Sequence, residues 1–112
     1  MTEGMFGEKQ FRLMKESAFL VNVSRGKLVN TDALVGTLSQ GRLRGVGLDV
    51  TDPEPLPENY PLKEFSNVII SPHIAGLSEH NRQRSIDLIK TNIKRFIHGW
   101  PLINLVDKGS GY

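Results

Sequence analysis

The sequence predicts an α/β fold built on a parallel β-sheet, and three observations support it. Short apolar runs of strand length occur at residues 18–23, 45–50 and 67–71. A segment with helical character separates the first two runs, and a loop with four prolines in residues 52–61 separates the last two. A longer helical pattern follows the third run. This alternation of short apolar strands with helices favours parallel strands.

The first strand and the helix after it have clear boundaries. Residues 18–23 (AFLVNV) are bounded by polar residues, which is typical of a strand buried on both faces of a parallel sheet. Asn30 or Thr31 is expected to cap a short helix from Asp32 to Gln40. Gly41 then ends this helix as the glycine that follows the C-cap.

The last third of the chain predicts a long amphipathic helix from Ser78 to His98. Its apolar residues recur at spacings of three and four, which predicts that they form a stripe packed in the core: Ile86, Ile89, Ile93, Phe96 and Ile97. The opposite side is basic and is expected to face solvent. Gly99 and Pro101 end the helix, and residues 101–106 (PLINLV) are expected to dock as an extended segment.

Composition bounds the class of protein. The chain has 112 residues, 38% of them hydrophobic, and a net charge of +2, which fits one globular domain without the basic excess of a nucleic-acid-binding surface. It has no cysteine, so disulfides, thiolate metal sites and cysteine nucleophiles are excluded. No apolar run approaches the ~18 residues of a membrane span, and no signal peptide is visible. We expect a cytoplasmic protein that binds no metal, membrane or nucleic acid.

Each predicted strand is followed by a residue that can take part in catalysis. Arg25 follows the first strand, Glu54 follows the second, and His73 follows the third. Ligands of parallel α/β sheets bind beyond the carboxyl ends of the strands. We therefore expect these three side chains to lie at one crevice.

The chemistry of the three residues is complementary. Arginine binds a carboxylate through two parallel hydrogen bonds, and histidine exchanges protons near neutral pH. A carboxylate beside a histidine fixes its ring and stabilises its protonated form. Glu54 lies between Pro53 and Pro55, which restrict the local backbone. Alone, this pattern fits a rigid surface turn that contains an acid; beside His73, it predicts a carboxylate aimed at the imidazole.

Three segments closely resemble, in order and spacing, the D-isomer-specific 2-hydroxyacid dehydrogenases: AFLVNVSRG, ALVGTLSQGRLRGVGLDVTDPEPLP and NVIISPHIAG. Within these segments, the sequence LDVTDPEPLP is most similar to the glyoxylate/hydroxypyruvate reductase branch of the family. The resemblance extends over almost the whole chain. It implies that the three segments belong to a Rossmann-like, doubly wound dinucleotide-binding domain.

The resemblance also implies a role for each matching residue. Arg25 would bind the substrate carboxylate and polarise its carbonyl, His73 would be the acid/base, and Glu54 would be the partner of His73. Asp49 would contact the nicotinamide carboxamide. The backbone around Val23 and Ser24, and the stretch from His73 to Gly76, would help to bind the cofactor.

Parts of the family pattern are absent. The sequence contains no G-x-G-x-x-G turn for the cofactor pyrophosphate. We therefore expect residues 1–77 to be the C-terminal part of a dinucleotide-binding domain, and residues 78–112 to be a helix and tail that return towards a missing substrate domain. Such a fragment is expected to be marginally stable or self-associating, and inactive alone.

The resemblance implies an NAD(P)-dependent oxidoreductase that reduces small 2-oxo acids, with glyoxylate or hydroxypyruvate preferred. Phosphoglycerate and D-lactate-type substrates remain open. The cofactor is NAD or NADP, and we favour NADP because that branch often uses it. The parent enzyme is expected to be a homodimer. The alternative is a non-catalytic dinucleotide-sensing or scaffolding relative, similar to the corepressors built on the same fold.

Overall fold

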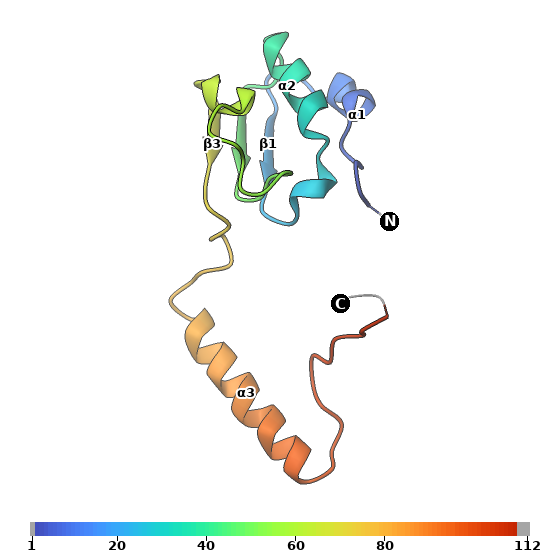
Figure 1. Cartoon of the computed structure of the whole chain (residues 1–112), viewed down its shortest axis with the longest axis vertical. Coiled ribbons are helices and arrows are strands. Elements are labelled where there is room, and N and C mark those ends of the chain that lie inside the picture. Colours follow the sequence, from blue (N-terminus) through green and yellow to red (C-terminus); the bar gives the residue numbers. More distant parts are fainter. Residues whose placement is uncertain (1, 110–112) are drawn as a thin grey trace. The chain divides into compact units, whose positions relative to one another are not determined.

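The computed structural model describes residues 2–109 and divides the chain between Ala75 and Gly76 into two compact units. The first unit contains a three-stranded sheet whose strands are all parallel (Figure 1). In spatial order the strands are β1 (Phe19–Asn22), β2 (Gly45–Leu48) and β3 (Val68–Ile70). The predicted α/β class with a parallel sheet is therefore confirmed, and each strand is two residues shorter than expected. The assignment of this unit to part of a larger dinucleotide-binding domain stays a prediction.

The crossover from β1 to β2 contains the predicted helix, α2 (Thr31–Ser39). Asn30 is its N-cap, and the Asn30 side-chain oxygen accepts a hydrogen bond from the backbone N–H of Ala33 at 2.9 Å. Gly41 has a φ of +70° just after the C-cap, a backbone conformation that glycine adopts without steric cost. Both helix-end signals in the sequence are thus present in the structure.

Replacing Asn30 by alanine should lower the free energy of unfolding by about 1 kcal/mol, because the first turn of α2 loses its side-chain acceptor. Urea unfolding followed by circular dichroism measures this change. Asn59→Ala is a suitable control, since Asn59 is an exposed residue of the loop after β2. Equal unfolding midpoints for the two variants would contradict the capping role.

Three short helices were not predicted. They are α1 (Glu8–Leu13) and two 3-10 helices, η1 (Gly26–Leu28) and η2 (Pro61–Glu64). A helix of six residues holds fewer than two turns, so its sequence shows no periodicity that can be recognised. α1 nevertheless contributes to the core, because Phe11 is only 1% exposed.

The core lies against one face of the sheet. Leu20 and Asn22 of β1 are buried, whereas Phe19 and Val21 are 64% and 66% exposed. The prediction that residues 18–23 are buried on both faces is therefore wrong. The reason is that α1, α2 and η2 all supply side chains to the same core cluster, which includes Phe11, Leu34, Leu38, Val46, Leu48 and Leu62.

The other face of the sheet is apolar and exposed to solvent in the first unit. Phe19 pairs in register with Gly45, and Val21 pairs with Gly47. A Cβ atom at Gly45 would lie 3.0 Å from the Phe19 ring. The glycines thus let the side chains of β1 lie over β2. Ile69 of β3 continues this face and is 75% exposed.

The second unit contains the helix α3 (Asn81–Ile97) and the tail that follows it. The helix begins three residues later than predicted and ends one residue earlier. None of its residues is buried, so the prediction of a core stripe is wrong for the described residues. Among residues 76–109 of this unit, the structure contains no second helix or strand against which α3 could pack.

The tail returns along α3, as Figure 1 shows. The Asn92 side chain accepts a hydrogen bond from the Ile103 N–H and donates one to the Ile103 carbonyl, each at 2.9 Å. This amide satisfies both backbone groups of one tail residue. Within residues 2–109, no helix is both long enough and apolar enough to cross a bilayer.

Candidate active site

The loops after β1, β2 and β3 leave the sheet at the same edge. Asn22 is in register with Leu48, and Leu48 is in register with Ile70. The ladder continues past the strands, because Asp49 N–H donates to Asn22 O and Ser71 N–H donates to Leu48 O, both at 2.9 Å. Parallel pairing therefore carries three loops to one side, which is where ligands of such sheets bind.

His73 and Glu54 form the central contact at this edge. His73 Nδ1 lies 2.7 Å from Glu54 Oε1, and their side chains are 50% and 40% exposed. An ionised carboxylate only accepts hydrogen bonds, so with Glu54 ionised this contact is a hydrogen bond donated by the imidazole Nδ1–H. The Nε2 atom is then available to a ligand. At this exposure, solvent weakens the pair, so its main effect is to orient the ring.

Asp49 holds the turn in which His73 lies. Its carboxylate accepts hydrogen bonds from Ser71 Oγ at 2.6 Å, Ile74 N–H at 2.9 Å and Ala75 N–H at 2.7 Å. Its carbonyl accepts the His73 N–H at 2.9 Å. The Ser71 hydrogen bond, helped by the two amides, lowers the pKa of Asp49 although its burial acts in the opposite direction. Asp49 is therefore ionised at neutral pH.

Arg25 lies on the loop after β1, and its side chain is exposed. Its Nη1 donates to the Ser24 carbonyl at 2.8 Å, rather than to Glu54 or His73. The buried Asn22 shapes this loop, because its amide donates to the Arg25 carbonyl at 2.9 Å and accepts from the Ser24 N–H at 3.1 Å. The guanidinium is thus free to turn towards a ligand carboxylate.

Gly26 brings the loops after β1 and β2 into contact. A Cβ atom at this position would lie 1.9 Å from the Thr51 carbonyl oxygen and 2.8 Å from the Asp52 nitrogen. Only glycine allows this approach of two backbones. The contact places Arg25 beside the segment that leads to Glu54.

A cavity of about 540 Å³ borders the His73–Glu54 pair. Its volume falls in the ordinary range for small-molecule sites. The lining combines polar and apolar groups from β3 and from the loops after β2 and β3: Asp49, Thr51, Glu54, Pro55, Leu56, Lys63, Ile70, Ser71, Pro72 and His73. Lys63 is the cation of this lining, and its Nζ lies 3.5 Å from the Leu56 carbonyl oxygen.

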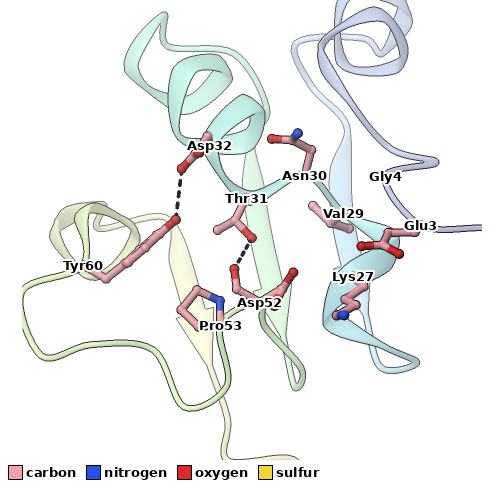
Figure 2. A pocket seen from close by; sticks show the side chains of 10 residues that line it. All are labelled: Glu3, Gly4, Lys27, Val29, Asn30, Thr31, Asp32, Asp52, Pro53 and Tyr60. Carbon is pink, nitrogen blue, oxygen red and sulfur yellow. Dashed lines mark hydrogen bonds between the residues drawn. The ribbon is translucent and has the colours of Figure 1, made fainter.

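A second cavity, of about 330 Å³, lies beside the first turn of α2 (Figure 2). Its lining contains neither Glu54 nor His73. Two hydrogen bonds drawn in Figure 2 join residues of its lining: Thr31 Oγ1 donates to the Asp52 carbonyl at 2.8 Å, and Tyr60 OH donates to Asp32 at 3.1 Å. Partial burial, together with Asp32, raises the pKa of Tyr60. These two hydrogen bonds connect α2 to residues 52 and 60, which lie on either side of Glu54 in the loop after β2.

The residues expected to bind the cofactor are divided between the two units. Val23, Ser24 and Asp49 lie at the carboxyl edge of the sheet, and Val23 is exposed. Gly76 belongs to the second unit, so the structure does not place it at the site. Within the described residues, no three His, Cys, Asp or Glu side chains are grouped to hold a metal ion.

Sequence reasoning did not single out three residues that shape the site: Asn22, Gly26 and Ser71. Each had a signal. Asn22 is a polar residue inside an apolar run, Gly26 directly follows the candidate arginine, and Ser71 ends the strand before His73. Asn22 contacts Ser24 and Arg25 in its own loop, whereas Gly26 and Ser71 contact the loop after β2, and a single sequence does not reveal such long-range partners.

Known proteins with similar sequences and structures identify the family. The family described as "D-isomer specific 2-hydroxyacid dehydrogenase, NAD binding domain" matches residues 1–75. The chain is 41% identical over 107 residues to a glyoxylate reductase of Thermofilum pendens, covering 96% of this chain and 32% of that protein. It is also 41% identical over 101 residues to a human glyoxylate reductase/hydroxypyruvate reductase, covering 90% of this chain and 31% of that one.

Solved structures agree with the sequence comparison. A D-isomer specific 2-hydroxyacid dehydrogenase from Xanthobacter autotrophicus Py2, crystallised with NADPH and MES, superposes with a TM-score of 0.85 at 33% identity. The match covers 99% of this chain and 45% of that structure. This chain spans about a third of the length of the two curated relatives. It belongs to the D-isomer specific 2-hydroxyacid dehydrogenase family, and its residues 1–75 match the NAD-binding domain of that family.

Proposed function

We propose that this chain supplies the acid/base and substrate-binding residues of an NAD(P)-dependent dehydrogenase that reduces small 2-oxo acids. The contact between His73 Nδ1 and Glu54 Oε1 at 2.7 Å carries this proposal. A paired, half-exposed imidazole beside a cavity of suitable volume can reach a bound ligand and give it a proton, as general acid catalysis needs. Glyoxylate and hydroxypyruvate are the preferred substrates, because the similar relatives bear those names.

The residues of the site fit the nicotinamide end of the cofactor. Oδ2 of Asp49 accepts one hydrogen bond, from Ala75 N–H, so a lone pair is left for a carboxamide N–H. Val23 and Ser24 are exposed at the end of β1. The 112 residues offer no glycine-rich turn for the pyrophosphate. The similar structure from Xanthobacter contains NADPH, which supports NADP as well as NAD as the cofactor.

The roles of the three residues follow from their chemistry. A bound dihydronicotinamide would supply the hydride that adds to the 2-carbon of the substrate. Arg25 binds the substrate carboxylate through its two-pronged guanidinium. The protonated His73 donates the proton on Nε2 to the carbonyl oxygen, and Glu54 holds Nδ1–H throughout. The balanced reaction is 2-oxo acid + NAD(P)H + H⁺ → 2-hydroxy acid + NAD(P)⁺.

The test is a chimera in which this chain replaces the matching segment of the Thermofilum glyoxylate reductase. We expect the chimera to oxidise NADPH or NADH in the presence of glyoxylate or hydroxypyruvate, measured by the loss of absorbance of the reduced cofactor. Comparing the two cofactors decides between NAD and NADP. A folded chimera that binds the cofactor but reduces no 2-oxo acid would overturn the proposal in favour of a non-catalytic role.

In this chimera, Glu54→Gln should shift the pH profile of 2-oxo acid reduction to lower pH. The reaction needs the protonated imidazole, and the neutral amide stabilises that form less than the carboxylate does. Glu58→Gln is the matched control, because Glu58 is an exposed acid in the same loop. If Glu54→Gln and the control gave the same pH profile, the pairing would have no role in catalysis.

A further inference from the structure

The turn that contains His73 is held in an uncommon backbone conformation. His73 has a φ of +54°, in the left-handed region that side chains other than glycine adopt only when neighbouring contacts hold them there. The His73 N–H donates to the carbonyls of Asp49 and Ser71, at 2.9 Å and 3.1 Å. The next two N–H groups, of Ile74 and Ala75, both point at the Asp49 carboxylate. Asp49 is thus the acceptor around which the turn closes.

Ser71 connects this acceptor to the sheet. Its backbone is fixed by the hydrogen bond to Leu48 O at 2.9 Å, and its hydroxyl donates to Asp49 Oδ1 at 2.6 Å. Ile74 N–H shares the same oxygen. Hydrogen bonds to an ionised acceptor are the strong ones, and Asp49 is only 5% exposed, so water replaces a lost partner poorly.

We infer that Ser71 is a positioning residue, which acts through Asp49 to hold His73 against Glu54. The chain of contacts is continuous: Ser71 Oγ orients the Asp49 carboxylate, the carboxylate binds the N–H groups of the turn, and the turn places Nδ1 at 2.7 Å from Glu54. The inference rests on the proposed function, because Ser71 can affect catalysis only if His73 is the acid/base. It differs from a direct contact with the cofactor, because Ser71 acts on the tautomer and direction of the imidazole.

The experiment measures the tautomer of His73 in the 112-residue chain. The chain has three histidines, and His73→Asn identifies the signal of His73 in ¹⁵N spectra of the imidazoles. We expect the neutral ring of the wild type to carry its proton on Nδ1. Ser71→Ala should lower the ratio of Nδ1–H to Nε2–H about two- to fivefold, the range for a solvent-screened pair. The pKa of Asp49 should rise towards its ordinary value, because its largest lowering contact is removed.

Two further variants distinguish the hydrogen bond of the Ser71 hydroxyl from the size and shape of the side chain. Ser71→Thr keeps the hydroxyl and should retain the Nδ1–H tautomer, whereas Ser71→Val has the same branched shape without the donor and should lose it. Ser66→Ala, at an exposed serine before β3, should leave the ring unchanged. A wild-type tautomer ratio in Ser71→Ala or in Ser71→Val would overturn the inference.

The wild type provides a test that does not depend on the folding of a variant. Because Asp49 has a pKa below its ordinary 3.8, its contacts should persist above that pH and be lost only as the pH falls further. The amide proton shifts of Ile74 and Ala75 should therefore change together with a midpoint below 3.8. Different midpoints for the Ile74 and Ala75 amide shifts, or a shared midpoint above pH 3.8, would contradict a turn that closes on the Asp49 carboxylate.

Turnover in the chimera separates this inference from the proposed function. Ser71→Ala should lower kcat with little change in KM, and should move the pH profile in the same direction as Glu54→Gln. An inactive chimera whose tautomer responds to Ser71→Ala would refute the proposed function alone. If the chimera is active but Ser71→Ala changes neither the His73 tautomer ratio nor the pH profile, the inference alone is refuted.

Discussion

Gly26→Ala should destabilise the chain by about 3 kcal/mol or more, the upper end of the range for overpacking substitutions. The added Cβ would lie 1.9 Å from the Thr51 carbonyl oxygen and 2.2 Å from the Thr51 carbonyl carbon. Both atoms are backbone, so no side-chain rotation relieves the clash. The loops after β1 and β2 must separate, and the segments that carry Arg25 and Glu54 separate with them.

Urea unfolding of Gly26→Ala measures the effect, and Gly36→Ala provides the matched control. Gly36 lies inside α2, and a Cβ there would meet nothing within 4 Å. In that position alanine should stabilise the chain by about 0.5–1 kcal/mol, because glycine is the poorer helix former. The same glycine-to-alanine change should therefore lower the free energy of unfolding at residue 26 and raise it at residue 36. A destabilisation below about 1 kcal/mol for Gly26→Ala would show that the two loops are not in close contact.

His73→Gln should slow the reduction of glyoxylate and hydroxypyruvate by the chimera, with kcat falling about 10²–10⁴-fold, the usual contribution of a general acid. The amide cannot donate a proton at neutral pH, whereas its size still fills the site. KM should change little, because the substrate carboxylate is bound by Arg25. Steady-state kinetics with the two substrates test this.

Arg25→Ala should behave differently, since it removes both the carboxylate contact and the polarisation of the carbonyl. We expect KM to rise and kcat to fall together. Arg25→Lys should restore little, because an ammonium group does not form the two parallel hydrogen bonds of a guanidinium. Identical kinetic changes in Arg25→Ala and His73→Gln would contradict the separate roles.

A further variant distinguishes the loss of the imidazole from a change in the backbone. His73 has a φ of +54°, and asparagine tolerates this region better than glutamine does. His73→Asn should therefore be as inactive as His73→Gln while keeping the turn intact. His98→Gln is the control for a histidine that stacks on Trp100 at 4.7 Å, and it should keep full activity.

The sequence by itself determined the three strands, α2 and α3, but not the three shorter helices. Asn30 and Gly41 mark the ends of α2 because capping and left-handed backbone depend on the residue itself and its nearest neighbours. The three apolar runs predicted the parallel strands, and their order along the chain indicated that Arg25, Glu54 and His73 follow successive strands. The pairing of Glu54 with His73 was predicted from the prolines beside the acid and from complementary chemistry.

The tertiary structure alone decided which surfaces are buried and how the loops are held. An apolar run is the same in sequence whether one or both faces of its strand are covered, so the exposure of Phe19 and Val21 could not be predicted. The close approach at Gly26 involves Thr51, and the Asp49 carboxylate collects donors from residues 71–75. These contacts join segments 20 or more residues apart, and only chain folding brings such groups within the short range of a hydrogen bond or a van der Waals contact.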